Sequence, residues 1–258
     1  MDVIDKPGTG TSLVTADLDQ FRLRRFIENL AAADELERRE ARVDLADIAE
    51  ILDGNPRAVH FLAVGPEQQE LVGNVMSCRS RIARAFGVPP ERLAAEIRRR
   101  LANKLQIVEV SAAEAPAQEV VLVGEEADLT ALPVHLQHGL DGAPYISASI
   151  DYAVDARTGW TNVGIRRLML RGRRETGVDL VSPSDLRALY EASAAAGRPL
   201  PVSFVVGAHP IDHVAAMMRM PVDELGIVAS LRDVPLPVVK CITNDIRVPA
   251  DAEVVLEG

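Results

Sequence analysis

The spacing of apolar residues in the first part of the chain predicts helices and a strand. From Leu18 to Leu30 apolar residues recur every three or four positions, the period of an amphipathic helix. The cluster of turn residues from Asp53 to Pro56 then ends a second helix, and a mostly apolar run after it predicts a buried strand. The predicted elements are helices at 18–30, 45–52, 79–86 and 91–102 and a strand at 58–64. We therefore expect an N-terminal α/β domain over residues 16–112, after a flexible tail at residues 1–15.

Strands dominate the pattern after a small-residue, proline-containing stretch at 111–118, which we interpret as a domain boundary. Predicted strands cover 119–123, 146–154, 162–170, 202–206, 238–243 and 253–256, and predicted helices cover 184–196 and 211–218. The turn at 155–159 is expected to join two of the strands as a hairpin. Short strands with few helices favour a barrel or sandwich core for residues 113–258. Because the chain ends on a strand-like run at Gly258, we expect this second domain to be incomplete.

Composition and charge narrow the class of protein. The chain has 258 residues, of which 48% are hydrophobic, so it can bury a substantial core. Its net charge of −10 would repel a phosphate backbone, which argues against a nucleic-acid partner. No apolar run approaches the roughly 20 residues that a membrane span needs. Cys78 and Cys241 lie far apart and the start has no secretory signal, so we expect two buried thiols in a cytoplasmic protein.

The segment Trp160–Arg167 is the strongest candidate for chemistry. It places an amide oxygen at Asn162, a glycine at Gly164 and two adjacent cations at Arg166 and Arg167 inside an otherwise apolar strand pattern. A plain core strand would not carry such a set.

Several stretches, in this order along the chain, resemble the UbiD-type decarboxylases. They are Asp128–Pro133, His138–Ile146, Asn162–Arg167, Val239–Asp245 and Val248–Gly258, and the resemblance spans about Asp19 to Gly258. It implies an α+β protein with an N-terminal α/β domain followed by a flavin-reductase-like split β-barrel that holds prenylated FMN. In that family the modified flavin carries an azomethine ylide that adds covalently to an unsaturated or aromatic carboxylic acid before carbon dioxide is lost. Mn²⁺ (or Mg²⁺) and K⁺ tie the cofactor phosphate to the protein.

The resemblance also implies the metal ligands. Asn162 matches the metal-binding asparagine of the family and Glu224 matches its glutamate, whereas Asp185 falls where the family often has histidine. An amide oxygen with two carboxylates still makes an all-oxygen site for manganese or magnesium. Asp185 also stands at a predicted helix start, where a carboxylate caps backbone N–H groups, so a capping role stays open.

Arg167 matches the catalytic arginine of the family, five residues after Asn162. Residues five apart on a regular strand point to opposite faces, so simple pleating would select Arg166 instead, unless a bulge or kink occurs at Gly164. We expect Arg167 to hold the substrate carboxylate and keep Arg166 as its rival. The resemblance further implies cofactor contacts from the strand residues Val163, Gly164 and Ile165 and from the loop residues Met220 and Pro221.

The acidic pair that protonates the product in this family lies beyond the position of Gly258, which leaves three hypotheses. The chain is a portion or subunit of a UbiD-like (de)carboxylase, completed by a second chain or a C-terminal half. Alternatively, it is a short flavin-dependent enzyme of different chemistry, or a non-catalytic partner module that retains the barrel. The first hypothesis is preferred, and it implies a small carboxylic acid substrate, a homo-oligomer and a flavin prenyltransferase as cofactor supplier.

Overall fold

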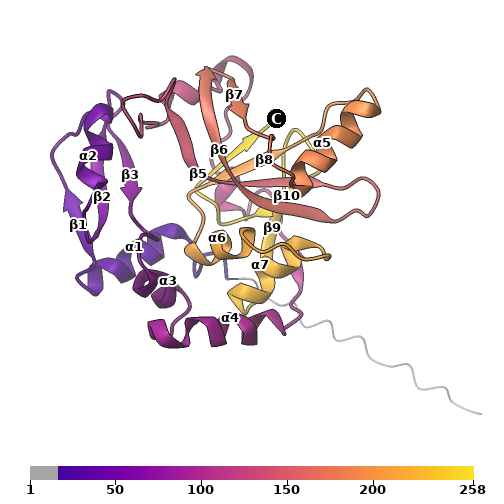
Figure 1. The fold of residues 1–258 in the computed structure, drawn as a ribbon, viewed down its shortest axis with the longest axis horizontal. Helices are drawn as coiled ribbons and strands as arrows, with labels where there is room; N and C mark the ends of the chain where they lie inside the picture. The colour runs from indigo at the N-terminus through magenta and orange to yellow at the C-terminus, as the bar shows by residue number, and fades with distance from the viewer. Residues whose placement is uncertain (1–16) are drawn as a thin grey trace, which may run out of the picture.

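The computed structural model describes residues 17–258, and the predicted tail at residues 1–15 lies outside them. Within this range the protein is mixed α/β, with three sheets and the N-terminal elements on one side of a curled antiparallel sheet (Figure 1). None of its helices in residues 17–258 is both long and apolar enough to span a membrane.

The first sheet has the order β1-β2-β3, with β1 parallel and β3 antiparallel to β2. The elements of this part are α1 (Leu23–Ala32), β1 (Leu36–Arg39), α2 (Ile48–Leu52), β2 (Ala58–Val64), β3 (Gln69–Gly73), α3 (Arg79–Ala85) and α4 (Leu93–Leu101). The predicted strand and the later helices are confirmed. Helix α1 begins later than the apolar period predicted, because the Asp17 carboxylate accepts the backbone N–H groups of Asp19 and Gln20 and holds that segment in a turn.

The central sheet is antiparallel throughout, in the order β11-β8-β5-β6-β7. Its strands are β5 (Tyr145–Val154), β6 (Thr161–Gly172), β7 (Glu175–Val178), β8 (Ser203–Val206) and β11 (Val254–Glu257). The predicted hairpin between β5 and β6 is confirmed, and Figure 1 shows these two as the longest and most curved strands. A smaller sheet of β4 (Ile107–Glu109), β9 (Leu236–Lys240) and β10 (Arg247–Pro249) lies beside it.

Helices α5 (Asp185–Ala195), α6 (Pro210–Ala216) and α7 (Glu224–Arg232) pack near the central sheet. One face of β5 and β6 contributes Ile150, Tyr152 and Val163 to the largest apolar core, which α6 and α7 also form. The other face contributes Ile146 and Leu168 to a smaller core. Alternate residues of the same strands therefore enter different surroundings.

A buried ion cluster fixes helix α7. The Arg232 guanidinium, 1% exposed, donates through Nε to Asp212 of α6 at 2.8 Å and through Nη1 to Asp251 at 2.7 Å. Because a buried charge is costly unless it is paired, this contact ties α7, α6 and the turn before β11 into one unit.

One predicted strand and one of the two cysteines differ from the sequence predictions. The strand predicted at 119–123 is wrong: this segment is an irregular loop in which Val120 is 75% exposed. Its β-branched residues have high strand propensity, but no neighbouring strand pairs with them among the described residues. The expectation of two buried thiols holds for Cys241 only, because Cys78 is partly exposed beside Ser80.

Candidate functional site

Strand β6 carries the residues that the sequence singled out. It pairs with β5 without any register shift from Thr161 to Arg166, so Asn162, Gly164 and Arg166 share one face. Arg167 projects from the opposite face. The one irregularity between these strands lies on β5, between Ile146 and Ser149, and not at Gly164.

Asn162 and Glu224 meet although they lie 62 residues apart in the chain. Glu224 is the first residue of α7, and its Oε2 accepts the Asn162 Nδ2–H at 2.9 Å and the Val163 N–H at 2.6 Å. With Nδ2 turned to Glu224, the amide oxygen of Asn162 is the atom that faces away from this contact. The structure therefore brings together two of the three predicted metal ligands.

The charge of Glu224 is poorly compensated. Burial raises the pKa of its carboxyl, against the lowering effect of the hydrogen bonds from Val163 and Asn162, and the nearby negative charge of Asp185 raises it further. Helix α5, which begins at Asp185, and helix α7, which begins at Glu224, both contact β6, so all three predicted ligands lie in one region. A cation placed there would relieve the repulsion between the two carboxylates.

Asp185 is the first residue of α5, but it is not the residue that caps this helix. The cap is Ser184, whose hydroxyl accepts the Arg187 N–H at 3.2 Å. Both oxygens of Asp185 accept from Arg219, Oδ2 from Nε at 2.8 Å and Oδ1 from Nη2 at 2.6 Å. Asp185 is therefore held by an ion pair, in a side chain 42% exposed.

The side chains of Asn162, Asp185 and Glu224 provide three oxygen ligands for a hard cation only if the amide oxygen of Asn162 is one of them. Among residues 17–258, no group of three His, Cys, Asp or Glu side chains is close enough to hold a metal by itself. Asn162 and Glu224 touch through the Nδ2–H of the amide, so each can offer an oxygen to a cation, and Asp185 would have to leave Arg219 to join them. Oxygens from a bound phosphate and from water would complete the shell.

Asp151 belongs to the same face of the sheet, and the sequence analysis did not identify it. Its side chain is fully buried opposite Gly164, and no hydrogen-bond donor among the described residues reaches either oxygen. Burial raises the pKa of Asp151 to about 6; Arg166, whose Nε is 3.6 Å from Oδ1, lowers it, and Glu224 raises it. A single acidic residue within the apolar run of β5 is the signal that could have identified it.

Gly164 provides the space for this carboxylate. A Cβ atom at position 164 would lie 2.9 Å from Oδ1 of Asp151, closer than real contacts allow. The space beside Gly164 on the Asn162 face is thus taken by a side chain of the protein itself.

The remaining predicted residues lie on β6 itself and in the loop before α7. The guanidinium of Arg167 lies over the Tyr145 ring, 5.3 Å from its centroid, and its side chain is exposed. Met220 and Pro221 are exposed in the loop between α6 and α7, directly after Arg219. Val163 is buried and Ile165 is partly buried against the main core.

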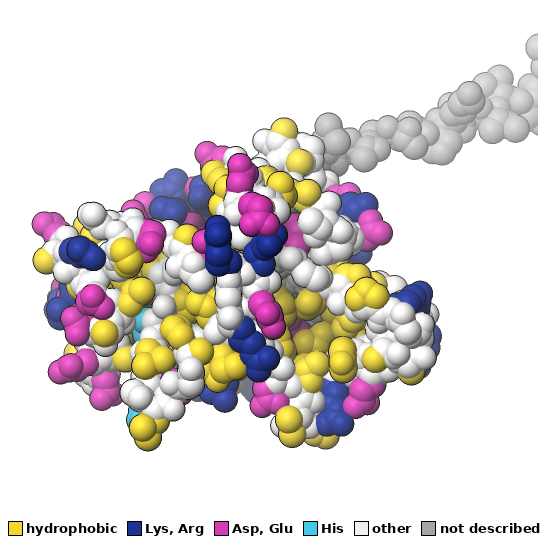
Figure 2. Space-filling view, turned by 90° about the horizontal axis from the view of Figure 1, so that it is seen from above, with side chains coloured by type: hydrophobic (Ala, Val, Ile, Leu, Met, Phe, Trp, Pro, Cys, Tyr) yellow, Lys and Arg dark blue, Asp and Glu magenta, His cyan; other side chains and the backbone are white. Residues whose placement is uncertain are grey.

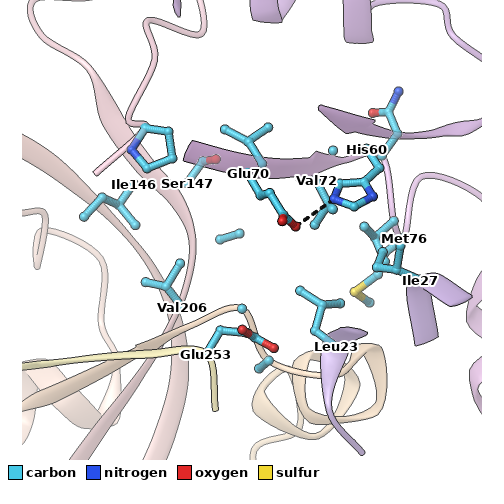
Figure 3. Close-up of a pocket in the computed structure, with 18 of the residues that line it drawn as sticks. Leu23, Ile27, His60, Glu70, Val72, Met76, Ile146, Ser147, Val206 and Glu253 are labelled. Atoms are coloured by element: carbon cyan, nitrogen blue, oxygen red, sulfur yellow. Dashed lines mark hydrogen bonds and ion pairs between the residues drawn. The ribbon is translucent and has the colours of Figure 1, made fainter. Parts of the chain in front are cut away.

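A cleft of about 1110 Å³ lies between the first sheet and the central sheet (Figure 3). Figure 3 shows Glu70 pointing from β3 into the cleft toward His60, with their side chains 3.0 Å apart, and Glu253 on the opposite wall. The cleft reaches Tyr145 and Ile165, on the Arg167 side of β6, but neither Arg167 nor Asn162, Asp185 or Glu224 lines it. The candidate metal site is therefore defined by its oxygen atoms, and Arg167 meets the cleft only through the Tyr145 ring that its guanidinium covers.

Two domain families match the chain. Residues 27–101 match the 3-octaprenyl-4-hydroxybenzoate carboxy-lyase N-terminal domain, and residues 108–258 match the Rift-related domain of the same carboxy-lyase. A relative from Methanosarcina mazei, anhydromevalonate phosphate decarboxylase, is 35% identical over 73% of this chain and 43% of its own. A relative from Pseudomonas aeruginosa, pyrrole-2-carboxylic acid decarboxylase, is 34% identical over 69% of this chain and 37% of its own.

A solved structure is similar over nearly the whole chain. It is an evolved dimeric form of the UbiD-class enzyme HmfF from Pelotomaculum thermopropionicum in complex with prFMN, with 33% identity and a TM-score of 0.86. The match covers 92% of this chain and 56% of that one. The chain thus spans about half the length, or less, of the relatives it matches.

Proposed function

The chain belongs to the UbiD family, and from this premise we propose that it carries the cofactor-binding portion of a prenylated-FMN-dependent decarboxylase. The observation that supports the proposal is the meeting of Asn162 and Glu224 beside β6, with Asp185 in the same region. The substrate would be an unsaturated or aromatic carboxylic acid, the class to which the pyrrole-2-carboxylate of one relative belongs.

Asn162, Glu224 and Asp185 would hold a divalent cation, Mn²⁺ or Mg²⁺, and through it the phosphate of the flavin. Val163, Gly164 and Ile165 would lie along the cofactor, and backbone carbonyls near Met220 and Pro221 would serve K⁺. These assignments agree with the oxygen chemistry of the site. Because Asp151 fills the space beside Gly164 on one face, a cofactor would meet this segment through its backbone or from the other face.

The residues of the chain would bind and orient the acid. Arg167 has its guanidinium over the ring of Tyr145, which lines the cleft, and from there it would pair bidentately with the substrate carboxylate and fix its direction. The bound prenylated flavin would supply the electron sink for the loss of carbon dioxide. Arg166 is the alternative to Arg167 for binding the substrate carboxylate, because it shares the face of Asn162 and is oriented by Asp151.

We further propose that the central sheet is the split barrel of a flavin-reductase type and that residues 16–112 and 113–258 form two domains. Strand β4 precedes this boundary yet pairs with β9 of the second part, so its pairing favours a boundary in the connection before β4. Separate free thiols at Cys78 and Cys241 agree with the reducing cytoplasm as the location.

A second chain or a C-terminal half would complete the site, and the assembly would be a homo-oligomer. Figure 2 shows hydrophobic side chains gathered in and around hollows on the face seen from above, with basic side chains between them. Exposed apolar surface of this kind is typical of contact surfaces. An evolved form of the similar HmfF enzyme, in complex with prFMN, is dimeric, which agrees with this proposal.

The test is co-expression of the chain with a flavin prenyltransferase, followed by an absorption spectrum and metal analysis of the purified protein. We expect a bound modified flavin and about one Mn²⁺ per chain. A colourless protein without metal would contradict the proposal and favour a non-catalytic partner module. Carbon dioxide release is then measured with pyrrole-2-carboxylate and ferulate, the acids named for relatives.

A further inference from the structure

The ion pair between Arg219 and Asp185 engages one of the three predicted metal ligands. It joins the loop before α7 to the first turn of α5, 34 residues away, and it uses both carboxylate oxygens. The Arg219 side chain is 72% exposed, so the guanidinium can leave without unfolding its surroundings. The contact is therefore strong in geometry but free to exchange.

Arg219 serves as the counter-ion of Asp185, to which it donates two hydrogen bonds. These hydrogen bonds and the charge of Asp185 raise the pKa of its guanidinium, and the more distant charge of Glu224 adds to this. In this state Arg219 compensates the charge of one of the carboxylates that a divalent cation would bind. A metal ion and this guanidinium consequently compete for the same negative charge.

Coordination of Asp185 to a metal would break the bidentate contact. At least one oxygen would turn to the metal, and the divalent charge would repel the guanidinium. Arg219 would then carry free N–H donors beside the bound ion. A guanidinium in that position matches the oxygens of a phosphate group.

We propose that Arg219 is an exchangeable counter-ion, which holds Asp185 while the metal is absent and passes to the phosphate of the flavin when the metal binds. This inference rests on the proposed function, because it takes the metal and phosphate site as given. It adds a positioning residue, Arg219, to the ligand set. It also requires that the metal and the phosphate bind cooperatively, each increasing the affinity of the other by the same factor.

The experiment is a calorimetric titration of Mn²⁺ into the protein alone, with FMN, and with riboflavin, which lacks the phosphate. For the wild-type chain we expect tighter Mn²⁺ binding with FMN than with riboflavin. Arg219→Gln removes the competitor, so Mn²⁺ alone should bind about two- to fivefold more tightly, the range of an exposed ion pair. The advantage of FMN over riboflavin should fall about tenfold, because a charged phosphate contact is lost.

Arg187→Gln is the matched control. Arg187 lies on the same helix as Asp185 and pairs with Glu191 at 2.7 Å, so the variant removes the same charge without touching Asp185. It should bind Mn²⁺ and FMN as the wild type does. Arg219→Lys keeps the charge but loses the bidentate contact, and should fall between the wild type and Arg219→Gln.

The outcomes separate the inference from the proposed function. One outcome would refute the inference alone. In it, Mn²⁺ binds the wild type, Asn162→Ala lowers the affinity for Mn²⁺, and Arg219→Gln binds Mn²⁺ and FMN as the wild type does. Arg219 would then not be the counter-ion. Weaker Mn²⁺ binding in Arg219→Gln would likewise overturn it. If the wild type binds neither Mn²⁺ nor FMN, the metal and phosphate site of the proposed function falls, and the inference falls with it.

Discussion

Replacing Asp151 by asparagine should stabilise the protein at alkaline pH. The carboxylate is fully buried between β5 and β6, and no hydrogen-bond donor among residues 17–258 reaches it. The nearest positive atom is Nε of Arg166, at 3.6 Å. Burying a charge with so little compensation costs free energy, and an amide of the same shape would avoid that cost.

The size of the expected gain in stability follows from the pKa of Asp151. Burial raises this pKa to about 6, from the 3.8 of an unperturbed aspartate. A difference of about two pH units corresponds to about 3 kcal/mol of unfolding free energy. The effect of Arg166 is already contained in that pKa.

The effect of Asp151 on the unfolding free energy depends on pH. The folded-state pKa lies above the unfolded one, so the folded protein binds more protons than the unfolded chain between about pH 4 and pH 6. The contribution of the Asp151 carboxyl to the unfolding free energy is fully present below pH 4 and is lost as the pH rises through 6. Asp151→Asn should therefore gain up to about 3 kcal/mol at pH 8 and less than about 1 kcal/mol at pH 4.

Urea unfolding of both proteins at pH 8 and pH 4 measures the difference. Glu175→Gln, which removes an exposed carboxylate from the same sheet, controls for net charge and should change stability little at either pH. Were Asp151→Asn less stable than the wild type at pH 8, the attraction to Arg166 would outweigh the cost of burial, and this reasoning would be refuted.

Four further variants test the site and the core. Glu224→Gln should weaken the retention of Mn²⁺ and flavin, and equal metal content in the two proteins would remove Glu224 from the site. Arg167→Ala should abolish hydrogen–deuterium exchange into the decarboxylated product while flavin stays bound, and loss of exchange in Arg166→Ala alone would assign the carboxylate contact to Arg166. Arg232→Met leaves two buried aspartates unpaired, so the unfolding free energy should fall by about 3–5 kcal/mol, and denaturant unfolding within 1 kcal/mol of the wild type would contradict this.

The hairpin of β5 and β6 was predictable from local patterns. Apolar runs on either side of a turn containing Asp155 and Gly159 determine it, and these signals are all close in sequence. Asn162 and the two arginines after it were identified because polar residues stand out within such a run. Local signals thus suffice where the structure is itself local.

Helix α7 could not be predicted in the same way. Its residues are buried on nearly every side, so the amphipathic period that marks a surface helix is missing. The contact of Glu224 with Asn162 needs the helix to be placed against β6, which depends on packing between distant segments. The family resemblance supplied Glu224, whereas periodicity and propensity did not.

The difficulty over the two arginines is one of strand geometry. The expectation allowed for a bulge at Gly164 that would bring Arg167 to the face of Asn162, but pairing is regular there and the irregularity lies on β5. Gly164 instead leaves room for the Asp151 carboxylate, which in turn faces Arg166. A glycine inside a strand signals close approach, and sequence alone does not tell whether a ligand or a neighbouring side chain makes that approach. If Arg167 binds the substrate and Asn162 holds the cofactor phosphate, the two groups act from opposite faces of β6, and the flavin must pass around the edge of this strand.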